Sequence, residues 1–259
     1  MSSAPVSSPG PSQAPSLTFA PLPSTRRGYG IQLSSHPKGT HVAYTSGRLV
    51  VVRSLDNPVD SLLFTEHKCN VQVATFAPSG FFIASGDEEG NVIVWSYPGL
   101  KIKSQFRIGK TVLDLDWDES STRIIACGDG AQKAKVFGWE SGNNLGELTM
   151  HSQPAISCTY RKVKPFKCVT ASEDLTVNLY EGPPFKYTTS YKGTSFSQQI
   201  VAIQFLNPPT SLRVCHSHQL HRFHVFRTLC IISIKRITHR LYPSFAVFYN
   251  LIVHYYCKL

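Results

Sequence analysis

Residues 83–95 read IASGDEEGNVIVW, in which two apolar segments flank a short stretch of Gly, Asp and Glu and the second segment ends in tryptophan. Short β-branched and aromatic segments around such turn residues predict two strands joined by a tight turn. The pattern recurs as IACGDGAQKAKVFGW at residues 125–139 and as VTASEDLTVNLY at residues 169–180. The closing aromatic residues, Trp95, Trp139 and Tyr180, lie 44 and 41 residues apart. The chain therefore contains an internal repeat.

A further strand is predicted ahead of each copy and keeps the same step. Its last aromatic residue is Phe76, Trp117, Tyr160 and then Phe205, at intervals of 41, 43 and 45 residues. A more divergent first copy occupies residues 36–53. A period of 40 to 45 residues that closes on an aromatic residue is the spacing of WD-repeat blades. The sequence therefore predicts an all-β fold, a partial WD40-type β-propeller of about four blades with irregular segments at both ends.

The composition predicts three parts. Residues 1–24 hold six Pro, seven Ser and no charged residue, which predicts a disordered leader, with an organelle transit peptide as the alternative. Residues 25–209 carry the propeller repeats. Residues 210–259 hold six of the ten His, three of the seven Cys and no acid. We expect this basic tail to be unstructured or to be translated noncoding sequence.

Charge and cysteine content narrow the classes of partner. The net charge is +10, but seven Lys or Arg lie in residues 210–259, so the rest of the chain carries only +3. We therefore expect no nucleic-acid partner. The most apolar stretch, residues 245–253, is too short to span a bilayer, so no membrane partner is expected. The odd number of Cys and the absence of a Cys-x-x-Cys pair favour free thiols in a reducing compartment.

We do not expect the tail to bind a metal ion. Cys215, His216, His218, His221 and His224 are all potential zinc ligands, but their spacing matches no familiar zinc finger. The prediction is that the chain holds no metal and no cofactor.

Several polar residues fit the architecture of a WD repeat. His67 and His151 precede a predicted buried strand, and Glu89 and Asp174 each lie six residues before a closing aromatic residue. In WD repeats such an acid, the His and a Ser hydrogen-bond together and hold the blade. The predicted network comprises His67, Glu89, Trp95, Trp139, His151, Ser157 and Asp174.

The loops resemble one family in particular. Residues 76–87 read FAPSGFFIASGD, residues 139–143 read WESGN, and residues 180–187 read YEGPPFKY. Together these resemble the actin-interacting protein one family over about residues 22–206, and the last segment is the most specific. The resemblance implies two joined seven-bladed propellers in the whole protein, of which this chain holds an amino-terminal part. It also implies a cytoplasmic protein of the actin cytoskeleton that binds actin filaments decorated with cofilin and promotes their severing.

The resemblance also implies which residues face the filament. Asp174, Phe185 and Tyr187 match acidic and aromatic positions of that surface, and Gln132 stands where the family often has Glu. Two alternatives stay open: Asp174 is a turn residue of the blade, or Phe185 and Tyr187 pack on the next blade.

The sequence offers less support for two other functional classes. A generic WD-repeat scaffold, such as a substrate receptor of a cullin-type ubiquitin ligase, usually shows Trp-Asp-x-Arg at the end of a blade. The chain has WSYP at residues 95–98 and WESG at residues 139–142 instead. An enzyme is not expected, because the sequence contains no Gly-rich phosphate loop, nucleophile elbow or His-Glu-x-x-His run.

Overall fold

The computed structural model describes residues 19–25, 32–57, 59–130, 133–192, 200–205, 211–216, 224–227 and 230–233. Within these residues all the regular secondary structure is β-strand, and the strands form five four-stranded antiparallel sheets. Each sheet is called a blade. The first blade has β1 (Ser34–Ser35), β2 (His41–Ser46), β3 (Leu49–Ser54) and β4 (Ser61–Phe64). The second has β5 (Val71–Phe76), β6 (Phe82–Asp87), β7 (Asn91–Ser96) and β8 (Ile102–Arg107).

The later blades repeat this order of strands. The third blade has β9 (Val112–Trp117), β10 (Arg123–Gly128), β11 (Ala134–Gly138) and β12 (Asn144–Glu147). The fourth has β13 (Ala155–Tyr160), β14 (Lys167–Ser172), β15 (Thr176–Glu181) and β16 (Lys186–Lys192). The fifth has β17 (Ile200–Phe205), β18 (Ser211–His216), β19 (His224–Arg227) and β20 (Cys230–Ser233).

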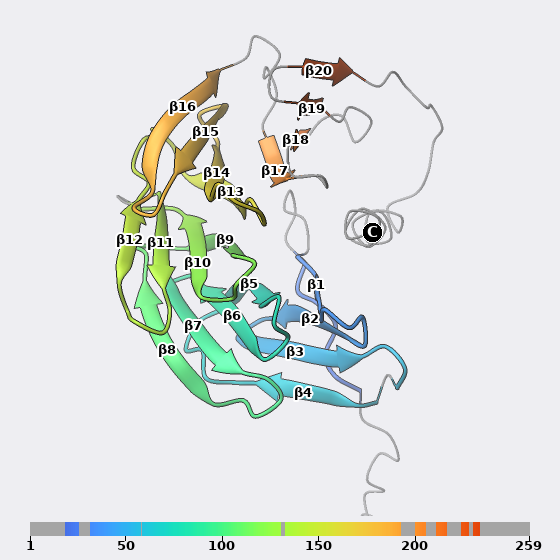
Figure 1. Cartoon of the computed structure of the whole chain (residues 1–259). Helices are drawn as coiled ribbons and strands as arrows, with labels where there is room; N and C mark the ends of the chain where they lie inside the picture. The colour runs from blue at the N-terminus through green and yellow to red at the C-terminus, as the bar shows by residue number, and fades with distance from the viewer. Residues whose placement is uncertain are drawn as a thin grey trace, which may run out of the picture.

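The blades follow one another around an arc (Figure 1). Strands β5, β9, β13 and β17 contact each other in turn on the concave side, and β4, β8, β12 and β16 lie on the convex side. This arrangement confirms the predicted all-β fold and the partial propeller. In the described part of the chain no helix is long and apolar enough to cross a bilayer.

The hydrophobic core lies between blades and not within them. Successive residues of β10 show why, because alternate side chains of a strand point to opposite faces of the sheet. Ile124 and Ala126 pack against the second blade, whereas Ile125 and Cys127 pack against the fourth. A third cluster, which includes Phe64 and Trp95, fills the space between the first and second blades. A blade in this fold therefore depends on a neighbour at each face.

Both predicted boundaries of the propeller differ from the structure. Residues 19–25 are held against the first blade: the Tyr44 hydroxyl donates to the carbonyl of Pro21 at 2.8 Å, and the Ser24 N–H donates to the carbonyl of Thr45 at 3.0 Å. At the other end, β18, β19 and β20 lie beyond residue 209 and pair in order onto β17. Residues 211–216 read SLRVCH, with apolar residues at alternate positions, and this short pattern favours a strand. Residues 1–18 and 234–259 lie outside the described residues.

Two glycines permit close approaches, Gly128 inside the third blade and Gly86 between the second and third blades. A Cβ on Gly128 would lie 1.9 Å from the carbonyl oxygen of Thr111, and a Cβ on Gly86 would lie 2.4 Å from Cγ1 of Val112. The register of β9 and β10 shifts at Gly128, and the register of β5 and β6 shifts beside Gly86. A side chain at either position requires the backbone or a buried valine to move.

We predict that Gly128→Ala lowers the free energy of unfolding by about 1–3 kcal/mol, because the added methyl group overlaps a backbone carbonyl. Gly99→Ala is the matched control, since its Cβ would meet only the Ser96 hydroxyl at 3.4 Å. Urea unfolding followed by tryptophan fluorescence measures both. Equal stability of the two variants would contradict the close approach at Gly128.

Candidate functional site

A buried histidine organises a hydrogen-bond network in the second blade. His67 Nδ1 lies 3.1 Å from Oδ2 of Asp87, and its Nε2 lies 2.7 Å from the Ser85 hydroxyl. Trp95 Nε1 donates to the same hydroxyl at 3.1 Å, and the Trp95 ring stacks on Phe64 with centroids 4.3 Å apart. The network ties the segment before β5 to β6 and β7.

A second network of the same form lies in the fourth blade. His151 Nε2 lies 2.7 Å from the Thr170 hydroxyl, and its Nδ1 lies 3.2 Å from Oδ2 of Asp174. The Thr176 hydroxyl lies 3.1 Å from the same nitrogen. Burial lowers the pKa of both His151 and His67 below the usual value, so each imidazole stays neutral at pH 7.

The acid of the second blade is not the predicted one. Asp87, at the end of β6, contacts His67, and its Oδ1 accepts the backbone N–H of Glu89 at 3.0 Å. The Glu89 side chain accepts a hydrogen bond from the Cys69 thiol, which raises the pKa of that thiol to about 11. In the fourth blade the residue that corresponds to Asp87 is Ser172, and Asp174 reaches the histidine from the turn instead. Counting back from the aromatic residue therefore identified the acid in one blade only.

The third blade replaces the polar network by apolar contacts. Ile108 and Ala126 stand where the other blades have His and Ser or Thr, and both are buried in the core. Phe137 pairs with Ile124 as Trp95 pairs with Ile83, and it stacks on Phe106. The predicted closing residue, Trp139, lies two positions further on.

Trp139 has a different role from the one predicted. Its Nε1 donates to the carbonyl of Ser121 at 2.6 Å, and its ring packs on Phe82 with centroids 4.6 Å apart. Tyr97 takes the corresponding position in the second blade, where it packs edge-on against Phe76. Trp139 thus closes the end of the interface between the second and third blades.

Ser157 also differs from its predicted role. Its hydroxyl donates to Oδ2 of Asp114 at 2.8 Å, and Thr170 supplies the hydroxyl next to Nε2 of His151. Ser157 lies on β13, the innermost strand of its blade, whereas Thr170 lies on β14. The serine therefore connects two blades and does not close the network of one.

The four residues expected to face a filament lie in different environments. Phe185 is 5% exposed and packs against Tyr160 with ring centroids 5.7 Å apart, so it is not an exposed anchor. Tyr187 is 42% exposed. Tyr187 and Asp174 line the same shallow cavity of about 250 Å³. Gln132 lies outside the described residues.

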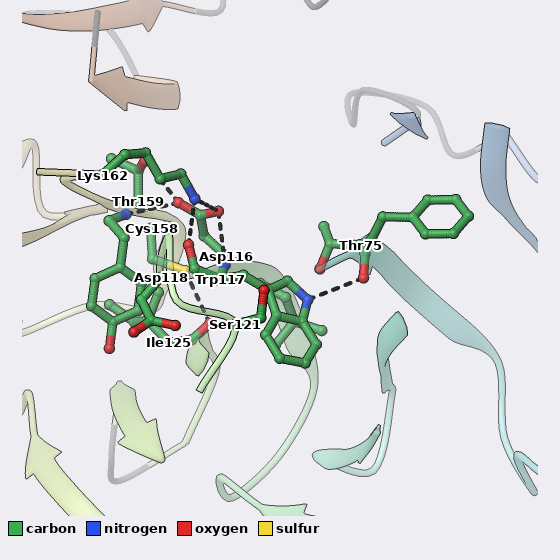
Figure 2. Close-up of polar contacts among 12 residues, drawn as sticks. Thr75, Asp116, Trp117, Asp118, Ser121, Ile125, Cys158, Thr159 and Lys162 are labelled. Carbon is green, nitrogen blue, oxygen red and sulfur yellow. Dashed lines mark hydrogen bonds and ion pairs between the residues drawn. The ribbon is translucent and has the colours of Figure 1, made fainter. Parts of the chain in front are cut away.

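A set of carboxylates that was not predicted from the sequence joins the third and fourth blades (Figure 2). Asp116 Oδ2 accepts hydrogen bonds from the Thr159 hydroxyl at 3.0 Å and from the N–H of Tyr160 at 2.7 Å. Lys162 donates to Asp116 Oδ1 at 3.0 Å and to the carbonyl of Trp117. The alternating acids of residues 112–117, VLDLDW, were the available signal, because alternate residues share a face of a strand.

Asp114 makes the same kind of contact deeper in the interface. Its Oδ2 accepts the Ser157 hydroxyl at 2.8 Å and the N–H of Cys158 at 2.9 Å. Its Oδ1 accepts the side-chain N–H of Gln32 at 3.0 Å. Burial raises the pKa of Asp114 to about 6, against the lowering effect of these hydrogen bonds.

Known proteins that are similar to this chain include one family model and several relatives. The family model "WD domain, G-beta repeat" matches residues 57–96. The chain is 42% identical over 179 residues to actin-interacting protein 1-2 of Arabidopsis thaliana, which covers 68% of this chain and 29% of that protein. It is 40% identical over 173 residues to actin-interacting protein 1 of Drosophila melanogaster, covering 65% of this chain and 28% of that protein.

A vertebrate relative shows a similar identity and coverage. The chain is 41% identical over 174 residues to WD repeat-containing protein 1 of Gallus gallus, covering 65% of this chain and 28% of the relative. The chain thus spans less than a third of the length of these relatives.

We predict that Ser85→Ala lowers the free energy of unfolding by about 2–4 kcal/mol, because it leaves His67 Nε2 and Trp95 Nε1 buried without their shared partner. Ser104→Ala in the same blade is the control: its hydroxyl is buried and has no hydrogen-bond partner among the described residues. Losing that hydroxyl should be neutral or stabilising. Chemical denaturation of both variants checks this, and a neutral Ser85→Ala would contradict the network.

We predict that Asp114→Asn changes how stability depends on pH. The pKa of Asp114 is about 6 in the folded chain against an ordinary 3.8, so the folded chain binds more protons between these values. The neutral carboxyl stabilises the folded chain below pH 4, and this stabilisation is lost as the pH rises through 6. The free energy of unfolding falls by about 3 kcal/mol at most.

Asparagine does not titrate, so the stability of Asp114→Asn relative to the wild-type chain should rise between pH 4 and pH 7. Denaturation of both proteins across this range isolates Asp114 from the histidines, because those are common to both. A constant difference between the two proteins would show that Asp114 does not titrate in this window.

Proposed function

Because this chain is a WD-repeat protein homologous over about two thirds of its length to proteins named actin-interacting protein 1, we propose that it binds actin filaments. The finer proposal is that binding promotes cofilin-dependent severing and disassembly in the cytoplasmic actin cytoskeleton. No bond is broken in this process. Severing is instead driven by binding energy that differs between the states of the filament.

The observation that carries the proposal is the surface beside Asp174 on the fourth blade. Two large side chains are exposed there, Tyr187 at 42% and Met150 at 56%. Both line the shallow cavity together with Asp174 and with Ser152, Thr176, Asn178 and Ser190. Exposed aromatic and methionine side chains around a fixed polar group are typical of the centre of a protein interface.

Asp174 offers a negative charge held in one orientation. Burial acts to raise its pKa, but hydrogen bonds from Thr176 and from the N–H of Ser152 hold the pKa below its ordinary value. The carboxylate is therefore ionised at neutral pH. Because His151 and Thr176 fix its position, little side-chain entropy is lost when a cationic group of a partner binds.

Dependence on cofilin rests on the resemblance of residues 180–187 to the family, and the structure gives this segment two roles. Phe185 anchors the loop against the third blade, where its N–H donates to the carbonyl of Leu145 at 3.0 Å. Tyr187 follows two residues later and remains exposed. A rigid loop that presents an exposed aromatic residue suits the recognition of one filament state over another.

We predict that Tyr187→Ala weakens binding to cofilin-decorated filaments by at least tenfold, the effect expected for an aromatic side chain at the centre of an interface. Phe81→Ala is the matched control, because Phe81 is 68% exposed on the β5–β6 turn of the second blade, away from this cavity. Cosedimentation with bare and with cofilin-decorated filaments measures both variants, and circular dichroism verifies folding.

The possible results separate the parts of the proposal. If the folded wild-type chain pellets with neither kind of filament, actin binding is wrong and a generic WD-repeat scaffold becomes the better description. If it pellets equally with both kinds, actin binding stands and cofilin dependence is wrong. If both variants bind like the wild-type chain, the contact lies elsewhere than on the fourth blade.

A further inference from the structure

Three side chains that commonly bind metals converge at the interface of the third and fourth blades. One ligand atom from each of Asp114, Cys127 and Cys158 lies within 4.8 Å of the other two. Asp114 and Cys127 are direct neighbours across β9 and β10, and Cys158 comes from β13 of the next blade. Neither the predicted network of the blades nor the proposed filament surface uses this cluster.

The charge of Asp114 is not balanced by a cation in the contacts that it makes. Its partners are the neutral donors of Gln32 and Ser157 and the N–H groups of Cys158 and Leu115. Asp116, two residues later on the same strand, pairs instead with Lys162. Both residues face the fourth blade, but only Asp114 has its carboxylate buried beside two thiols.

The two thiols share this environment. Both are buried, and the Cys158 thiol donates to the carbonyl of Ile125 at 3.8 Å. Burial raises the pKa of Cys127 and of Cys158, so both are protonated at neutral pH. A cation that prefers sulfur would bind by displacing these two protons, and it would supply the charge that the buried carboxylate lacks.

We propose that Asp114, Cys127 and Cys158 form a binding site for a thiophilic divalent cation, zinc above all, that joins the third and fourth blades. Two thiolates and a carboxylate are a ligand set that zinc accepts in tetrahedral geometry. Bonds of about 2.0–2.3 Å place such ligand atoms about 3.3–3.8 Å apart, so the cluster closes by about 1.5 Å at most. Gln32 donates through Nε2 to Asp114 at 3.0 Å, so its side chain lies beside the cluster.

The first test is a titration of the full chain with Cd²⁺, which shows an ultraviolet charge-transfer band when thiolates bind it. We expect the first equivalent of Cd²⁺ to give the band of two thiolates in the wild-type chain and in Cys69→Ala, whose thiol contacts Glu89 in the second blade and does not belong to the cluster. Cys127→Ala/Cys158→Ala should lose this equivalent, and Asp114→Asn should bind it at least tenfold more weakly. Retention of the first equivalent in the double variant would overturn the proposal.

A second measurement does not depend on how well the double variant folds. X-ray absorption of the wild-type chain loaded with one equivalent of Zn²⁺ should show two sulfur ligands at about 2.3 Å, with oxygen ligands and no imidazole. An imidazole signature, or any other number of sulfur ligands, would place the metal elsewhere and overturn the proposal. Neither experiment involves actin, so its failure is distinguishable from failure of the proposed function.

Discussion

The constraint on which the structure depends is that each inner blade has two apolar faces and can cover them only with its neighbours. The third blade shows this directly, since Ile124 packs toward the second blade and Ile125 toward the fourth. Backbone groups along β9 and β13 are buried by the same packing and need partners. Asp114 and Asp116 provide them by accepting the N–H groups of Cys158 and Tyr160. Apolar packing and hydrogen bonding thus act across one interface.

The networks inside the blades show which features tolerate substitution. A His, a hydroxyl and an acid hold the second and fourth blades, but the third has Ile108 and Ala126 in place of the His and the hydroxyl. A polar network in a low-dielectric interior stabilises only when every member has a partner. Replacing the whole set by apolar side chains is therefore acceptable, whereas losing one member is not. This explains why a blade without the histidine keeps the same four strands.

The period of the sequence was sufficient to predict the blades, because strands and turns depend on local patterns. It was insufficient where a role depends on register. Phe137, not Trp139, corresponds to Trp95, and Asp87, not Glu89, contacts His67. In both cases two residues of the same type lie two positions apart, and only the pairing of the strands selects one. Contacts between blades, such as Ser157 with Asp114, join residues 43 positions apart, so a local pattern marks the acid but not its partner.

The segment after β15 shows how packing and recognition become linked. In a regular strand Phe185 and Tyr187 would share a face, because side chains alternate. Phe185 instead precedes β16, and its side chain is held beside Gly146, where a Cβ would approach it to 3.0 Å. The register shifts between Leu179 and Tyr180, and Tyr187 lies opposite Tyr180 with its ring exposed. The buried aromatic residue fixes the loop on the third blade, and so it determines where the exposed one stands. A change at Phe185 therefore alters the surface of the fourth blade without touching a partner.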